Sequence, residues 1–181
     1  MIELTEDQIS KVLESLFQIT GPFVKRIFDR SESEQVFLRA IHGQVFLVSS
    51  PLLKFLDGMP MENLMGAGLL LGSFDESNRF HLEITCLELI ARISSNKVSI
   101  NNRVVQKFLN RDTLSAQSIT HTSNNLKNSL ERSVVLVTNA FGLAIGIGET
   151  SLDKKGEINL SSLTNIQEYL RIEQKSSTNF N

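Results

Sequence analysis

The chain begins with an amphipathic pattern that predicts a helix. Five apolar residues recur at the spacing of one helix face. They are Ile9, Val12, Leu13, Leu16 and Phe17. Thr5 and Gln8 form a capping box before this stripe, and Gly21-Pro22 ends the helix. We expect the stripe to pack into a core, with a partner-binding helix as the alternative.

Two strand pairs follow in the first half of the chain. Runs 35–41 and 44–49 flank His42-Gly43, a two-residue connection typical of a β-hairpin. Runs 66–72 and 79–85 flank a polar loop, and the second run alternates apolar and polar residues. These patterns predict an antiparallel sheet.

Short helices are predicted from Ser50-Pro51, with Ser50 as the cap and Pro51 at the first position, to near Gly58, and at 87–93. Ser94-Ser95-Asn96 then interrupts the apolar pattern and is the best linker. We therefore expect an N-terminal domain at 1–94 and a second domain at 95–173, with a disordered tail at 174–181.

The second half contains the most informative pattern. A strand is predicted at 97–100, a helix at 103–109 and a polar loop at 113–128. Two apolar runs between 133 and 148 then flank a turn closed by Gly142. The second run carries Gly146 and Gly148, and such glycines usually mark a bulge, a barrel corner or the close approach of another backbone. The pair favours a small closed β structure.

This hairpin resembles the last core hairpin of a PUA domain, an RNA-binding pseudobarrel. Further weak motifs extend the resemblance in order and spacing. They are Leu4-Thr5-Glu6, 42–49, Gly72, 79–85, 97–100, Phe108-Leu109 and 166–171. Together they are similar to the Nip-seven ribosome-biogenesis family, in archaeal-like form, which places an α/β pre-PUA domain before a PUA domain. The expected fold class is α+β, an antiparallel sheet with packed helices followed by a PUA-like β pseudobarrel.

Composition and charge modify this picture. The chain has 181 residues and a formal net charge of −2. Residues 1–94 carry a net −5 and residues 95–173 a net +2, so the second half is the electropositive one. The single cysteine, Cys86, excludes an internal disulfide and a cysteine-based zinc site. No secretory signal or membrane-spanning run is apparent.

No catalytic constellation is visible in the sequence. The histidines His42, His81 and His121 lack metal-ligand spacing, and we interpret them as turn, strand and loop residues. Cys86 reads as a buried small hydrophobe. The glycines at 142–148 lie inside a β-run and do not form a dinucleotide fingerprint. We therefore expect no catalytic residue, no metal, no cofactor and no enzyme activity.

Cations in the second half are the candidate site. Lys154-Lys155 follows the glycine strand, and Arg103, Lys107 and Arg111 lie on or after the short helix. The resemblance implies that such residues hold single-stranded precursor rRNA. It also implies glycines after the helix, where this chain has Asn110 and Ala116; Asn110 tolerates a positive φ.

The resulting hypothesis is a non-enzymatic, monomeric RNA-binding factor in large ribosomal subunit biogenesis and pre-rRNA processing. Its N-terminal domain would contact ribosome-assembly proteins, and no membrane is involved. It would act in the cytoplasm, or in the nucleolus of a eukaryote. One alternative is a protein–protein scaffold with a degenerate PUA domain. The other is an RNA-modifying enzyme that uses the PUA domain to dock its substrate.

Overall fold

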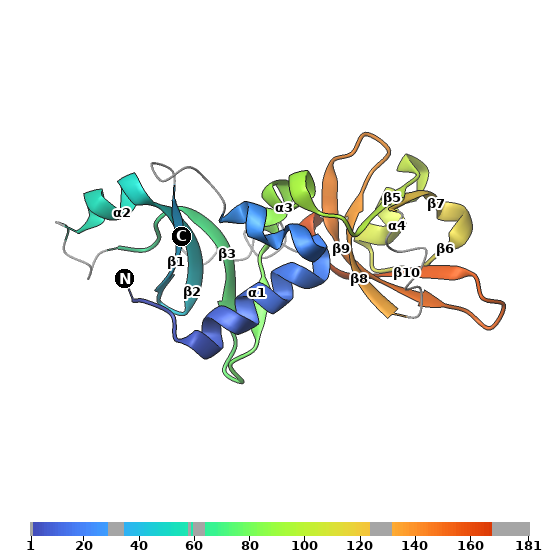
Figure 1. Ribbon diagram of the computed structural model, residues 1–181. Helices are drawn as coiled ribbons and strands as arrows, with labels where there is room; N and C mark the ends of the chain where they lie inside the picture. The colour runs from blue at the N-terminus through green and yellow to red at the C-terminus, as the bar shows by residue number, and fades with distance from the viewer. Residues whose placement is uncertain (1, 29–34, 58, 60–63, 124–131, 168–181) are drawn as a thin grey trace, which may run out of the picture. The chain divides into compact units, whose positions relative to one another are not determined.

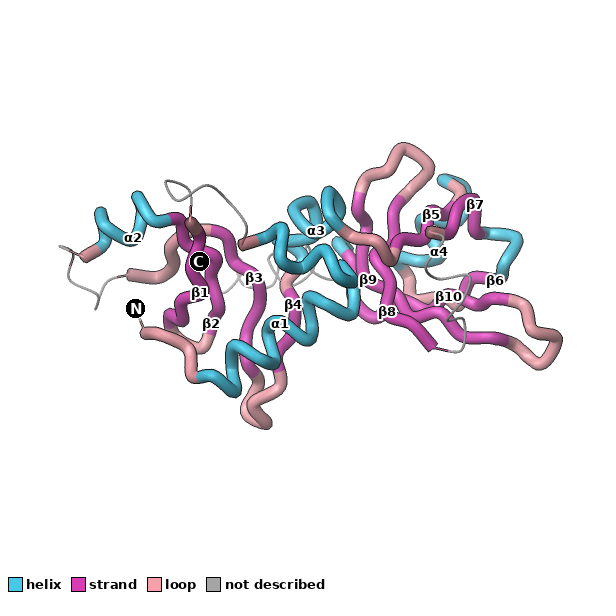
Figure 2. Tube along the Cα trace, viewed as in Figure 1, coloured by secondary structure: helices cyan, strands magenta, loops and turns pink. Residues whose placement is uncertain are grey.

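Two compact units divide the chain, Met1–Cys86 and Leu87–Asn181. The computed structural model describes residues 2–28, 35–57, 59, 64–123 and 132–167. Each unit contains a β-sheet and helices (Figures 1 and 2), which confirms the predicted α+β class. The helix α3 (Leu87–Ile93) contacts the second sheet, so its contacts group it with the second unit. The domain boundary after residue 94 stays a prediction, and the tail at 174–181 lies outside the described residues.

The first unit opens with α1 (Glu6–Thr20), which begins at the predicted capping box. The Thr5 hydroxyl accepts from the Gln8 N–H at 3.3 Å, and the Gln8 side chain accepts from the Thr5 N–H at 3.0 Å. A 3-10 helix, η1 (Gly21–Ile27), follows directly, with Pro22 in its first turn. The two reciprocal bonds satisfy backbone donors that a helix start otherwise leaves unpaired.

A four-stranded antiparallel meander forms the first sheet, in the order β1-β2-β3-β4. Its strands are β1 (Val36–Ile41), β2 (Gln44–Ser49), β3 (Leu69–Phe74) and β4 (Phe80–Leu82), with α2 (Ser50–Leu56) after β2. The turn residues His42 and Gly43 have φ of 49° and 80°. Positive φ at both central positions is the signature of the tight hairpin turn that fits strand twist. The predicted hairpin is confirmed.

The fourth strand is shorter than the predicted run 79–85. After β4 the chain closes into a 3-10 turn, η4 (Ile84–Cys86), with the Cys86 N–H donating to the Glu83 carbonyl at 3.3 Å. The Thr85 hydroxyl meanwhile donates to the Leu70 carbonyl at 2.9 Å. A local turn bond and a side-chain bond to β3 thus replace the ladder that an extended strand would have made.

A six-stranded mixed sheet forms the second unit, in the order β6-β10-β9-β8-β5-β7. Its strands are β5 (Lys97–Ile100), β6 (Leu114–Ser115), β7 (Ile119–Thr122), β8 (Arg132–Thr138), β9 (Ala144–Leu152) and β10 (Ile158–Asn165). The short helices η5 (Asn102–Val104) and α4 (Val105–Leu109) follow β5, and η6 (Ala116–Ser118) separates β6 from β7. The pair β5–β8 is parallel and the other pairs are antiparallel.

This sheet must curl strongly, because its two edge strands are neighbours in sequence. The edges β6 and β7 are joined by the three residues of η6 alone. Four peptide steps reach at most about 14 Å, whereas six strands laid flat place their outer edges roughly 24 Å apart. The curl encloses a buried apolar core that includes Val98, Phe108 and Leu160. The expected β pseudobarrel is confirmed as a curled mixed sheet.

The glycine pair has the predicted role. A Cβ on Gly146 would lie 2.4 Å from the Thr164 carbonyl oxygen, and one on Gly148 would lie 2.9 Å from that of Ser161. The register of β10 against β9 shifts between Ser162 and Thr164, beside these positions. The neighbouring backbone therefore approaches β9 more closely than a side chain allows.

The expectation of a mostly unstructured loop at 113–128 is wrong in part. Residues Leu114–Ser115 pair with β10 and Ile119–Thr122 pair with β5, while residues 124–128 lie outside the described residues. These short strands are mostly polar, so they carry no apolar alternation. Main-chain ladders to strands distant in sequence stabilise them instead.

Candidate functional site

Arg103 and Lys107 lie on the short helical segment that leaves β5. Asn101 caps this segment, its side-chain oxygen accepting from the Arg103 N–H at 3.0 Å. Both cationic side chains are exposed, while Phe108 is fully buried in the core of the sheet. The buried ring therefore anchors a helical segment whose outer face presents two cations, as the sequence predicts.

Arg111 extends this group at the end of the helix. Its φ is 66°, and its N–H donates to the Phe108 carbonyl at 3.0 Å. The expectation that Asn110 takes the left-handed conformation is wrong, because Asn110 has φ −81°. The turn that reverses the chain after α4 has its positive φ at Arg111, one residue after Asn110. A cationic side chain, rather than an amide, thus occupies the position that a glycine would suit.

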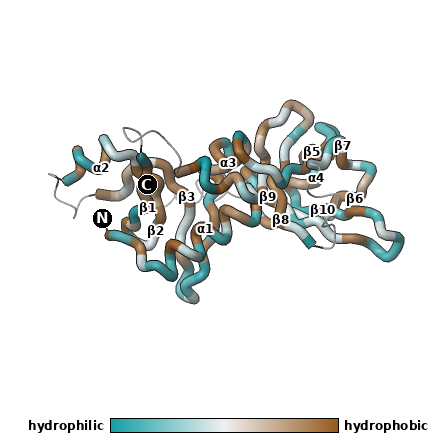
Figure 3. Tube along the Cα trace, in the orientation of Figure 1, coloured by the Kyte–Doolittle hydropathy of each residue, from teal (hydrophilic) through white to brown (hydrophobic). Residues whose placement is uncertain are grey.

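Lys154 and Lys155 lie in the hairpin turn between β9 and β10. The Asp153 carboxylate accepts from the N–H groups of Lys155 and Glu157, each at 2.8 Å. Both lysine side chains are exposed. Figure 3 shows the turn after β9 as hydrophilic. Asp153 and Glu157 flank the pair, so the local net charge of the turn is close to zero.

The structure does not bring the five predicted cations into one patch. The Asn165 amide donates to the Leu109 carbonyl at 3.2 Å, which fixes α4 beside the end of β9 that contains Gly146. The Lys154-Lys155 turn follows the other end of β9. Eight residue steps of strand separate these ends by about 26 Å. Arg103, Lys107 and Arg111 form one group, here called the α4 cations, and the lysine pair forms another.

An apolar groove lies on the first unit, on a surface that the sequence assigns to the core. The stripe of α1 divides into two rows: Val12 and Leu16 are fully buried, whereas Ile9 and Phe17 are 36% and 53% exposed. A hollow of about 570 Å³ opens beside the exposed row. Its lining residues are Ser10, Leu13, Glu14, Phe17, Val24, Lys25 and Phe28. The sequence signal for this groove was the width of the apolar stripe on α1, which is broader than one buried helix face requires.

A second hollow of about 320 Å³ lies between α1 and the edge strand β1. Arg39 lines it and is held by its own strand, donating to the Leu38 carbonyl at 2.9 Å. It also contacts the Glu3 carboxylate at 3.2 Å and lies 5.4 Å from the centre of the Phe37 ring. The Glu3 side chain is 82% exposed. The hollow thus combines apolar walls with a fixed guanidinium that already holds an exposed carboxylate. The two hollows together are called the α1 groove below.

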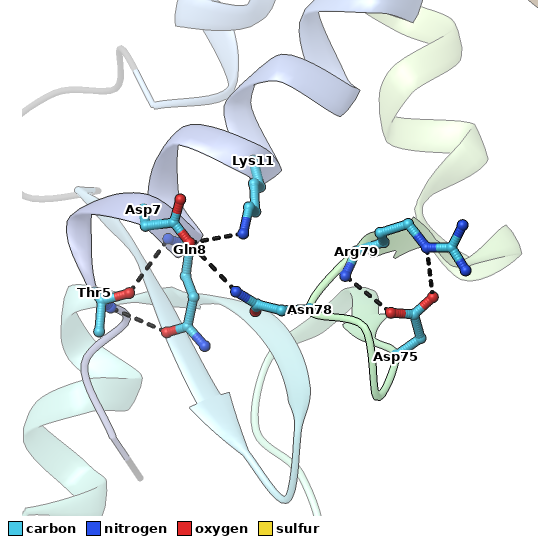
Figure 4. A network of polar contacts seen from close by, with 7 residues as sticks. All are labelled: Thr5, Asp7, Gln8, Lys11, Asp75, Asn78 and Arg79. Carbon is cyan, nitrogen blue, oxygen red and sulfur yellow. Dashed lines mark hydrogen bonds and ion pairs between the residues drawn. The ribbon is translucent and has the colours of Figure 1, made fainter.

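A polar network fastens the β3–β4 hairpin (Figure 4). The Asp75 carboxylate accepts from the Arg79 N–H at 2.9 Å and from the Arg79 Nε at 3.0 Å, and it contacts His81 Nε2 at 2.9 Å. The bond with His81, followed by those from Arg79, holds the pKa of the Asp75 carboxyl well below its usual range. The Asn78 amide donates to Asp7 at 3.3 Å, which joins the hairpin to α1.

The remaining candidate chemical groups have structural roles. Burial raises the pKa of the Cys86 thiol to about 12, which makes it a poor nucleophile at neutral pH. His121 was expected in a loop but lies on β7, where it pairs with Ser99 of β5. Within the described ranges, no three His, Cys, Asp or Glu side chains gather as a metal site. The same residues contain no helix long and apolar enough to cross a membrane.

The first unit is similar to a known family of domains. Residues 1–84 match the family described as NIP7/UPF0113, pre-PUA domain. The chain is 29% identical over 109 residues to the 60S ribosome subunit biogenesis protein nip7 of Schizosaccharomyces pombe, which covers 60% of each protein. It is 26% identical over 147 residues to the NIP7 homolog of Danio rerio, covering 80% of this chain and 81% of that protein. The match thus spans 60% of the length of the first of these relatives.

Among solved structures, the chain is similar to a conserved PUA domain protein from Thermoplasma acidophilum. The two share 13% sequence identity, with a TM-score of 0.49 over 90% of this chain and 91% of that one. A hypothetical protein from Pyrococcus horikoshii shows a comparable similarity, at 11% identity and a TM-score of 0.48.

Proposed function

We propose, from the premise that this chain belongs to the NIP7 family through its N-terminal domain, that it is a ribosome-assembly factor that binds RNA without altering it. Relatives are named 60S ribosome subunit biogenesis proteins, which supports a role in forming the large subunit. In this proposal the second unit binds single-stranded precursor rRNA. The first unit contacts assembly proteins.

The charge at the α4 edge of the second unit carries the RNA proposal. Residues 96–111 include Lys97, Arg103, Lys107 and Arg111 and no carboxylate, and residues 133–148 include no charged residue. Asp112 follows this run directly, so cations exceed acids there by four to one. An excess of exposed cations attracts phosphates, and binding releases counterions from the RNA. The α4 cations are therefore the primary contact. The lysine pair lies close enough for one strand of several nucleotides to reach both groups.

RNA titration at several salt concentrations tests this assignment. Each phosphate contact on a single strand contributes about −0.7 to the slope of log affinity against log salt. Arg103→Ala with Lys107→Ala should weaken binding and make the slope shallower by about 1.4. The matched double variant is Lys154→Ala with Lys155→Ala, in the turn between β9 and β10. An unchanged affinity and slope for the α4 pair would disprove the primary assignment, and the same result for the lysine pair would remove that second contact.

The α1 groove supports the proposed contact with an assembly protein. Its walls are apolar and exposed, and Arg39 holds a carboxylate of this chain that solvent readily reaches. A partner segment with apolar side chains and one acidic residue would fill the groove and replace Glu3. Phe17→Ser should abolish such binding without unfolding the chain, because the Phe17 side chain is half exposed. Phe55→Ser is the control, since Phe55 is 65% exposed and lies outside the groove.

The same experiments separate the alternatives. A scaffold that has lost RNA would keep partner binding and show no affinity for RNA in either salt series. An RNA-modifying enzyme would methylate or pseudouridylate the bound RNA. Mass spectrometry after incubation with a methyl donor detects the first, and a pseudouridine-specific chemical assay detects the second. In cells, cross-linking should map the contact to precursor rRNA, in the nucleolus of a eukaryote and in the cytoplasm otherwise. The chain is proposed to act as a monomer, which light scattering tests directly.

A further inference from the structure

The turn between β8 and β9 is fixed by an unusually dense set of hydrogen bonds. The Asn139 side-chain oxygen accepts from the N–H groups of Phe141 and Leu143, at 2.9 and 3.0 Å. The Asn139 N–H donates to the Leu143 carbonyl, and the Gly142 N–H donates to the Asn139 carbonyl, both at 3.0 Å. Gly142 supplies the positive φ, 81°, that closes the turn. The backbone of this turn is therefore held in one conformation.

This ordered turn presents apolar side chains to solvent. Phe141 is 79% exposed and Leu143 is 56% exposed, whereas Ile145, two residues further along β9, is buried. Neither side chain contributes to the core, so folding does not require an aromatic ring at position 141. An exposed phenylalanine on a fixed backbone loses little conformational entropy when a flat partner stacks on it.

The turn is also tied to the segment that carries the α4 cations. The Asn102 side chain accepts from the Ala140 N–H at 3.1 Å, and Arg103 is the next residue. The reason is topological. Because β5 and β8 are parallel neighbours, the chain leaves both strands at the same end of the sheet. Ser99 and Thr138, the last paired residues of the two strands, share a hydrogen bond of 2.9 Å between their hydroxyls. This end of the sheet thus holds an exposed ring, polar amides and three cations, with Asp112 as the acid next to Arg111.

We infer that Phe141 is a stacking platform for an unpaired base of RNA whose phosphates contact the α4 cations. This inference rests on the proposed RNA-binding function and adds to it a residue that contacts a base. A phosphate-only site would bind any polyanion, whereas a ring beside cations selects single strands with exposed bases. A protein partner is disfavoured, because one ring and one leucine flanked by cations and amides lack the broad apolar surround of a protein contact.

The chain contains no tryptophan, which permits a direct test. Phe141→Trp creates a single tryptophan at the proposed platform, and its emission can be excited apart from that of the one tyrosine. Titration with an oligoadenylate of about 12 nucleotides should quench its emission, since bases stack on the indole. An abasic oligonucleotide of equal length should bind through phosphate and leave the emission unchanged. Phe55→Trp, at an exposed position of the first unit, is the matched control and should show no change with either probe.

Affinity measurements provide the second readout. Phe141→Ala should weaken binding of the oligoadenylate at least about fivefold, because stacking of one base contributes that much or more. The slope of affinity against salt should stay unchanged, since no phosphate contact is removed. Binding of the abasic probe should also stay unchanged, and so should the melting temperature.

The outcomes distinguish this inference from the proposed function. If wild-type protein binds the oligoadenylate but Phe141→Trp is not quenched and Phe141→Ala binds equally well, the platform is disproved and the RNA proposal stands. If wild-type protein binds neither probe at low salt, the RNA proposal fails and the platform with it. Retention of RNA binding in Phe141→Ala, together with loss of an assembly-protein contact, would reassign the ring to a protein partner and overturn the inference.

Discussion

The ring of Phe108 lies directly against the Cα of Gly146. A Cβ added at position 146 would be 2.9 Å from the Phe108 Cε1 atom and still closer to the Thr164 carbonyl. The absence of a side chain on β9 thus lets α4 and β10 converge on the same point of the core. The position of the α4 cations depends on this convergence, because Phe108 anchors the helix that carries them.

Gly146→Ala should therefore destabilise the second unit. The added methyl group must displace backbone, and such overpacking should lower the free energy of unfolding by up to about 3 kcal/mol. Urea unfolding followed by circular dichroism would measure the change. Gly156→Ala is the control: a Cβ there meets open space, and only its positive φ of 77° opposes the substitution. Equal losses in both variants would show that close approach at Gly146 is unimportant.

Substitutions at Arg111 should separate conformation from charge. Asparagine tolerates positive φ, so Arg111→Asn should leave the free energy of unfolding nearly unchanged while the RNA salt slope becomes shallower by about 0.7. Arg111→Val should cost about 1 to 2 kcal/mol more, because a β-branched residue is strained at φ 66°. An Arg111→Asn variant with the wild-type salt slope would exclude this cation from the interface.

The Asp75 network should make the first unit sensitive to acid. Because the folded pKa of Asp75 lies below the unfolded value of about 3.9, its contribution to stability is present above that pH and is lost as the pH falls. Melting temperatures measured between about pH 2 and 6 should fall less steeply for Asp75→Asn than for wild type. Asp57→Asn, at the exposed end of α2, should retain the wild-type slope.

Asn102→Ala should loosen the β8–β9 turn without removing any cation or ring. The Ala140 N–H would lose its side-chain acceptor, and the change in stability should stay near 1 kcal/mol. Affinity for oligoadenylate should fall less than in Phe141→Ala, with the salt slope preserved. Asn110→Ala, an amide elsewhere on the same segment, should leave both quantities unchanged.

Local patterns were sufficient to predict much of this fold. The capping box at Thr5, the His42-Gly43 turn and the helix at 87–93 follow from short-range chemistry, and each is confirmed. The close approach at Gly146 was also predictable, because a glycine inside an apolar strand needs a packing reason. These features depend on residues near one another in sequence.

Features that depend on distant pairing were not predictable in the same way. The strands β6 and β7 are short and mostly polar, and each is stabilised by a partner that only the closed sheet brings near. The separation of the lysine pair from the α4 cations follows from the length of β9, which adjacent positions in a sequence do not reveal. The division of the α1 stripe at Phe17 likewise requires knowing what packs on each side.

The three-residue link between β6 and β7 constrains how this domain can vary. Since Ala116–Ser118 joins both margins of the sheet, lengthening this link would widen the cylinder and leave Phe108 and Leu160 with unfilled space. An insertion between Asp153 and Glu157 would only extend an exposed loop. Tolerance to added residues should therefore differ sharply between these two connections, although both are short, polar and at the surface.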